Sequence, residues 1–192
     1  MRGAVTLLAA ALAWASTLAL SSETRLPTDS LYQLQAQLLT HTGDHAGLDL
    51  YRGHPTLISM FYGSCPAACP MLITSMQVYE SHLDPASRAR LRVLLISFDS
   101  VHDTPQQLEQ LLRSHGADPT RWTFSSAPET DARKIAALLG FRYRKLPDGS
   151  FDHSLLITLL DSQGQVVATT TTMVGDAAFQ AKLQAATAVH AP

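Results

Sequence analysis

The sequence predicts an α/β protein in which a mixed β-sheet is flanked by helices, with an additional β-hairpin near the N-terminus. Two stretches, 56–62 and 91–98, are almost continuously apolar, which is typical of central strands covered on both faces. A helical pattern follows each of them, and two further strands and a last helix complete the chain. The chain has 192 residues, 46% of them hydrophobic and 16% charged, so the composition favours one globular domain.

The net charge argues against one class of partner. At pH 7 the chain carries a formal charge of -2, and it has no long run of lysine or arginine. A protein that binds nucleic acid normally presents a basic patch to the phosphates. We therefore expect no nucleic-acid partner.

The N-terminus resembles an export signal. A basic start, Met1-Arg2-Gly3, is followed by an uncharged apolar stretch over 4–20. We expect residues 1–20 to be a signal peptide or a membrane anchor, 21–30 a linker and 31–192 the folded domain, with cleavage left open. The domain is then expected in an oxidising compartment, the bacterial periplasm, reaching the membrane only through its N-terminal segment.

The elements of the first half follow from alternation, turns and helical spacing. The N-terminal hairpin is expected from 31–39 and 48–51, on either side of a turn at Thr42-Gly43-Asp44. The first buried strand then leads into a loop that contains cysteine, after which apolar residues recur at helical spacing over 70–82.

The second half is predicted from caps and stop signals. The second buried strand is followed by Thr104-Pro105 and Gln107, a capping box with proline at the first helical position. The remaining elements are a short strand at 121–124, a helix at 130–139 closed by Gly140, antiparallel strands at 155–160 and 166–170, and a helix at 176–188. Sites in such sheets form beyond the carboxyl ends of strands, where the cysteine loop and the segment 99–103 both fall.

Both cysteines lie in one loop, with Cys65 and Cys69 each followed by proline. Proline disfavours a helical conformation in the residue before it, so both cysteines are expected to be non-helical, with Pro70 opening the next helix. A helix N-terminus favours a thiolate over a thiol, which indicates a reactive or metal-binding pair. A local structural disulfide remains an alternative, whereas structural zinc is disfavoured because it needs four ligands.

His153 differs from the other histidines in its setting. Asp152 precedes it, Ser154 follows it, and it is expected in a loop immediately before an apolar strand. Taken alone, such a histidine is more often structural than functional. Combined with two thiolates, the imidazole forms a donor set that suits copper far better than magnesium or calcium.

Three segments together closely resemble the Sco/SenC family, in the family's order along the chain. They are CPAACP at 65–70, Asp99 with Asp103-Thr104-Pro105, and Asp152-His153-Ser154. This resemblance covers most of the chain beyond the linker. It implies a thioredoxin-like fold with an extra N-terminal hairpin, and copper bound by Cys65, Cys69 and His153.

The resemblance also implies a role and partners. Family members deliver copper to the binuclear copper centre of cytochrome c oxidase, or reduce its thiols. The implied partner is the copper-bearing oxidase subunit, with other copper chaperones or thioredoxin-like reductants as further partners.

This sequence departs from the family pattern at two positions. Ala67 stands where the family usually has an acidic residue, and Ser100 stands where it often has proline. The first change removes a charge beside the cysteine loop but no ligand. His102 is an additional imidazole near the predicted site, and we expect it to be exposed rather than to bind metal.

The leading hypothesis for function is a periplasmic copper metallochaperone that acts in oxidase assembly. The alternative is a thiol-disulfide reductase of the oxidase's copper-ligand cysteines, with Cys65 and Cys69 as its catalytic pair. A copper or redox sensor is a third hypothesis. The sequence does not decide among them, nor between Cu(I) and Cu(II).

Overall fold

A computed structural model of the protein describes residues 25–65 and 68–189. Its strands are β1 (Leu38–Thr40), β2 (His45–Ala46), β3 (Thr56–Phe61), β4 (Arg92–Ser97), β5 (Trp122–Ser126), β6 (Tyr143–Lys145), β7 (Phe151–His153), β8 (Ile157–Leu160) and β9 (Val166–Thr170). Its helices are the 3-10 helices η1 (Leu31–Gln33) and η2 (Leu48–Tyr51) and the α-helices α1 (Ala68–Ser81), α2 (Pro85–Arg90), α3 (Pro105–Ser114), α4 (Glu129–Leu139) and α5 (Ala177–Thr187).

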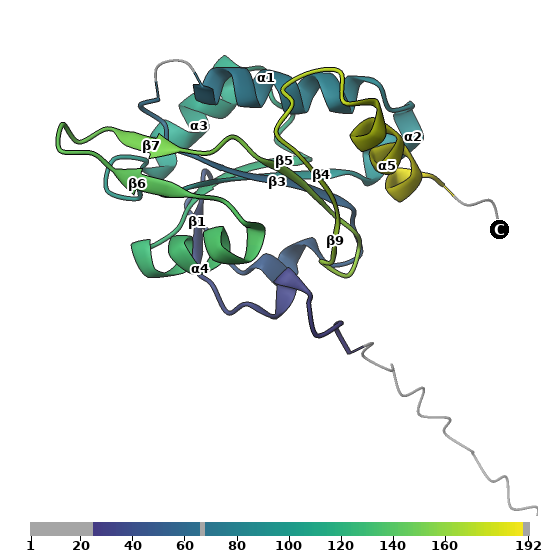
Figure 1. The fold of residues 1–192 in the computed structure, drawn as a ribbon, viewed down its shortest axis with the longest axis horizontal. Helices are drawn as coiled ribbons and strands as arrows, with labels where there is room; N and C mark the ends of the chain where they lie inside the picture. Colours follow the sequence, from purple (N-terminus) through teal and green to yellow (C-terminus); the bar gives the residue numbers. More distant parts are fainter. Residues whose placement is uncertain (1–24, 66–67, 190–192) are drawn as a thin grey trace, which may run out of the picture.

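The centre of the fold is a seven-stranded mixed sheet with the strand order β2-β1-β5-β4-β3-β8-β9. Figure 1 shows α1 and α4 on opposite faces of this sheet. Helix α5 packs on the same side as α1, where the rings of Tyr79 and Phe179 lie 5.0 Å apart. The predicted fold class, a mixed sheet flanked by helices, is confirmed.

Strand β3 lies inside the sheet, paired in parallel with β4 and antiparallel with β8. All of its residues are buried, which explains why its sequence is apolar on both faces. Because β3 and β4 run in the same direction, the loops that follow them leave from the same edge of the sheet. This edge is where the sequence predicts the site.

The N-terminal hairpin exists, but both of its predicted strands need correction. Of the predicted strand 31–39 only the end is a strand, as part of β1, and its beginning is the 3-10 helix η1. Strand β1 pairs with β2, which consists only of His45 and Ala46, and the predicted strand 48–51 is the 3-10 helix η2. In this helix Leu48 and Tyr51 are buried, whereas Leu50 is 66% exposed. Residues three apart share a face of a 3-10 helix, so Leu48 and Tyr51 are buried together. The alternation of apolar and polar residues over 48–51 therefore did not reflect a strand.

Two helix termini bear out the signals in the sequence. Thr104 and Gln107 form the predicted capping box of α3, and Gly140 closes α4 in the left-handed conformation with φ 71°. The sequence prediction missed the short helix α2, whose N-terminus is capped by the side chain of Asp84.

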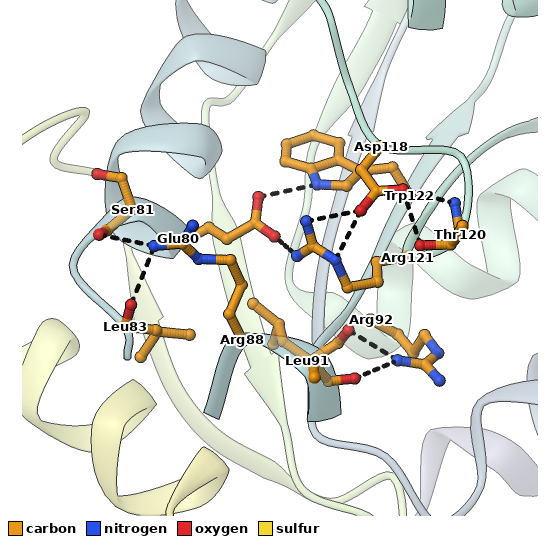
Figure 2. A network of polar contacts seen from close by, with 11 residues as sticks. Glu80, Ser81, Leu83, Arg88, Leu91, Arg92, Asp118, Thr120, Arg121 and Trp122 are labelled. Carbon is orange, nitrogen blue, oxygen red and sulfur yellow. Dashed lines mark hydrogen bonds and ion pairs between the residues drawn. The ribbon is translucent and has the colours of Figure 1, made fainter. Parts of the chain in front are cut away.

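The far end of α1 is fixed to β5 by a buried polar network, which Figure 2 shows. Glu80 of α1 accepts a hydrogen bond from Trp122 Nε1 at 2.9 Å and also pairs with Arg121. Arg121 pairs in turn with Asp118 at 3.0 Å. These contacts anchor the helix whose other end carries Cys69.

The predicted signal or anchor at 1–20 and residues 21–24 of the predicted linker lie outside the described residues. Within the described ranges, no helix is both long enough and apolar enough to span a membrane.

Candidate metal centre

Both cysteines are buried at the edge of the sheet beyond β3. Cys65 is 8% exposed and Cys69 is 3% exposed, both are thiols, and the Cys69 backbone N–H lies 3.4 Å from Cys65 Sγ. The expectation that both are non-helical is wrong for Cys69, which lies in the first turn of α1. Proline is tolerated in a first turn because its missing N–H has no intrahelical acceptor, so Pro70 does not delay the helix. Pro66 and Ala67 lie outside the described residues.

The surroundings of Cys69 favour the thiol in the metal-free protein. Burial raises the pKa of Cys69 well above its usual value, and the neighbouring Cys65 raises it further. The predicted shift toward a thiolate at the helix N-terminus is therefore wrong for Cys69, because burial disfavours the charged form. A bound cation reverses this balance, since coordination deprotonates a thiol.

His153 is brought to the cysteines by a small second sheet that the sequence prediction missed. Strands β6 and β7 pair with Tyr143 opposite His153, so His153 ends a strand and does not stand in a loop as predicted. Its Nε2 lies 3.9 Å from Cys65 Sγ, and its Nδ1 lies 2.9 Å from the Ser154 carbonyl oxygen. The Nδ1–H therefore donates to this carbonyl, which leaves the Nε2 lone pair toward the sulfur.

Aromatic rings hold the imidazole of His153 in place. Tyr62 meets it edge-on at 5.5 Å between centroids, Phe141 stacks on it at 6.1 Å, and Phe98 lies at 5.9 Å. These rings come from three separate segments of the chain. Sequence reasoning missed this aromatic cluster, because only the tertiary fold brings its members together.

The loop before Cys65 is fixed by hydrogen bonds to a buried carboxylate. Asp103 Oδ2 accepts hydrogen bonds from the Gly63 N–H at 2.7 Å and from the Ser97 hydroxyl. A Cβ at Gly63 would lie 2.3 Å from Asp103 Oδ1, so only glycine permits this approach. Burial raises the pKa of Asp103, and both hydrogen bonds oppose that rise. The sequence signal for this role was the position of Asp103 in the motif formed by Asp99 and Asp103-Thr104-Pro105.

His102 is exposed, as predicted. Its ring is 64% exposed and is paired with the carboxylate of Asp99, which is 8% exposed. It does not belong to the cluster formed by the two cysteines and His153.

The structure brings the three predicted ligands together. One ligand atom each from Cys65, Cys69 and His153 lies within 4.8 Å of the others. Two sulfur atoms and an imidazole nitrogen are soft and borderline donors, a set that suits copper and excludes the oxygen-seeking cations. The arrangement can bind a soft cation, or form a disulfide between the two sulfurs.

Comparison with known proteins places these features in one family. Residues 27–188 match the model of the family described as SCO1/SenC. A Stutzerimonas stutzeri protein described as copper-binding is 27% identical over 83 residues, which span 43% of this chain and only 41% of that protein.

Solved structures agree on the fold. ScoI of Bradyrhizobium japonicum, with copper bound, is 24% identical with a TM-score of 0.66, over 79% of this chain and 96% of that chain. A second structure is that of BsSco, a member of the Sco family of cytochrome c oxidase assembly proteins in which a disulfide switch was identified. It is 18% identical with a TM-score of 0.65, over 79% of this chain and 90% of that chain. At these identities the likeness supports the thioredoxin-like fold alone. Because the family match extends over most of the sequence, this chain belongs to the SCO1/SenC family.

Proposed function

We propose that this protein is a copper metallochaperone, which binds copper through Cys65, Cys69 and His153. The observation that carries the proposal is the convergence of their ligand atoms within 4.8 Å. Copper-bound ScoI and the copper-binding description of the Stutzerimonas protein support the choice of metal. The acceptor is the binuclear copper centre of cytochrome c oxidase, and the compartment is the periplasm, as the family's role and the N-terminal sequence suggest.

Each ligand has a separate task. The two sulfur atoms lose their protons when the cation binds, and their charge then favours Cu(I). His153 adds a neutral nitrogen whose direction is fixed by its Nδ1–H bond to Ser154. Three protein ligands leave room for a donor of the acceptor protein, so copper can be passed on by stepwise exchange of ligands.

Anaerobic titration of the reduced protein with Cu(I), in competition with a chromophoric chelator, tests the binding site. We expect one equivalent to bind tightly and His153→Ala to weaken the affinity by roughly tenfold or more. His82→Ala is the matched control, because His82 is an exposed imidazole just beyond α1. An unchanged affinity in His153→Ala would eliminate the three-ligand centre.

Delivery needs its own measurement. Copper-loaded protein is mixed with the apo soluble copper domain of the oxidase subunit, and the absorption of the binuclear centre is followed. Transfer should be faster than from an equally tight copper chelate. Equal rates would contradict a dedicated delivery role.

A thiol-disulfide reductase is the second candidate, favoured by the close approach of the two thiols. In this reaction one thiolate attacks a target disulfide, which releases one target thiolate and forms a mixed disulfide. The second cysteine then attacks the mixed disulfide and releases the other target thiolate. The target gains two electrons, and Cys65 and Cys69 end as a disulfide. Single Cys→Ser variants that trap no mixed disulfide with an oxidase subunit would argue against this candidate.

A further inference from the structure

The β6–β7 hairpin, which carries His153, presents two arginines on its outer face. Side chains alternate along a strand, and Tyr143 of β6 faces inward, where its ring stacks on that of Phe98 at 4.3 Å between centroids. Arg142, directly before β6, and Arg144 flank this tyrosine, so their side chains point away from the core. Both arginines are exposed. The outer face of the hairpin therefore carries two guanidinium groups.

Neither arginine is firmly bound within the protein. Arg144 lies 3.5 Å from Asp152, but the two side chains are 75% and 67% exposed, and exposed ion pairs are weak. No carboxylate among the described residues forms an ion pair with Arg142. The other two charges of the hairpin, Lys145 and Asp148, have opposite signs, so its net charge is positive, whereas the whole chain carries -2. The hairpin is thus a local basic surface on a slightly acidic protein.

A cavity connects these arginines with the candidate metal centre. It has a volume of about 370 Å³ and is lined by Arg142, Arg144, Asp152, His153 and Ser154. The Arg142 backbone N–H also donates to the Ser154 hydroxyl at 3.0 Å, and the Ser154 carbonyl accepts the Nδ1–H of His153. A group that enters this cavity therefore lies beside a proposed copper ligand.

We propose that the outer face of the β6–β7 hairpin docks the protein that receives copper, with Arg142 and Arg144 paired to carboxylates on an acidic surface of that protein. A guanidinium group binds a carboxylate through two parallel hydrogen bonds, which orients the partner as well as attracting it. The inference rests on the proposed function for the identity of the acceptor, the soluble copper domain of the oxidase subunit. Its test measures docking without copper, so the two proposals can fail separately.

The test is an NMR titration of the reduced, metal-free protein with the apo soluble copper domain at low salt. The largest shifts should occur at the amides of Arg142, Arg144 and His153. Arg142→Glu/Arg144→Glu should weaken the affinity about tenfold or more, because like charges then face each other across the interface. At about 1 M salt, where the Debye length is about 3 Å, the variant and the wild-type protein should agree within about twofold.

Arg25→Glu/Lys182→Glu is the matched control, since it changes the net charge equally at two exposed residues outside the hairpin. Lys182 lies on α5, which Figure 1 shows at the other end of the molecule from β6 and β7. The control should keep the affinity within about twofold. Equal losses in the two variants would overturn the proposal, because only the net charge would then matter. Absence of docking, or an unchanged affinity in Arg142→Glu/Arg144→Glu, would also overturn it.

Two parallel measurements separate this inference from its neighbours. Docking without copper transfer would support the docking surface and contradict the proposed function, whereas transfer with docking unchanged in Arg142→Glu/Arg144→Glu would overturn the docking surface alone. Vesicles of phosphatidylglycerol test the same face against a membrane. Vesicle binding that the arginine variant loses, with docking to the copper domain unchanged, would assign the face to a lipid surface and overturn the proposal.

Discussion

Replacing Asp103 by alanine tests whether this carboxylate holds the cysteine loop in place. Asp103 is 4% exposed and accepts hydrogen bonds from the Gly63 N–H and the Ser97 hydroxyl. Each bond to a charged group contributes about 1.5–3 kcal/mol, and the variant leaves both donors buried without an acceptor. The gain from no longer burying a carboxylate offsets part of this loss. We expect the free energy of unfolding to fall by about 3 kcal/mol.

Urea unfolding measures this change, and competition titration measures the accompanying loss of Cu(I) affinity. We expect the Cu(I) affinity to fall about tenfold. Residues that support a ligand without binding the metal typically change metal affinity by about 10–100-fold, and this is the lower end of that range. Asp103→Asn keeps an oxygen that can accept the Gly63 N–H, so it should lose only about 1 kcal/mol. Lys182→Ala, at an exposed position of α5, is the control with a change within about 0.5 kcal/mol. Equal stability of Asp103→Ala and this control would refute the reasoning.

Two further predictions concern the scaffold. Glu80→Gln should lower the free energy of unfolding by about 3 kcal/mol, because it removes one charged partner of the mostly buried Arg121. Urea unfolding measures this change, and a loss no larger than that of an exposed Glu→Gln change would contradict the prediction. The backbone N–H of Phe179 and the hydroxyl of Thr170 lower the pKa of Asp176 in the folded state. A group with a lowered folded pKa stabilises the protein above its unfolded pKa, about 4, and this contribution is lost as the pH falls through the folded pKa. Thermal melting between pH 6 and pH 2 should therefore depend less on pH in Asp176→Asn, and identical pH profiles would count against the assignment.

Much of the main sheet could be predicted from local sequence. The run 56–62 is apolar because β3 is covered on both faces, and Thr104 with Gln107 signals the start of α3 through contacts only three residues apart. Features of this kind depend on neighbours in the chain. They can therefore be predicted without knowledge of the tertiary fold.

The surroundings of the site depend on contacts that no local pattern encodes. Strand β6 is short and largely exposed, so it has no apolar alternation, yet its pairing with β7 positions His153. The raised pKa of Cys69 results from burial among distant segments, and local reasoning from the helix N-terminus gave the opposite sign. The motifs predicted the three candidate ligands, while the aromatic support of His153 became visible only in the structure.

The central claim is that Cys65, Cys69 and His153 together bind copper. X-ray absorption of the Cu(I)-loaded protein tests it most directly, with His153→Ala measured alongside. The account predicts a first shell of two sulfur atoms and one imidazole nitrogen in the wild-type protein, and loss of the nitrogen in the variant. A first shell that contains only sulfur in the wild-type protein, or one that His153→Ala leaves unchanged, would contradict it.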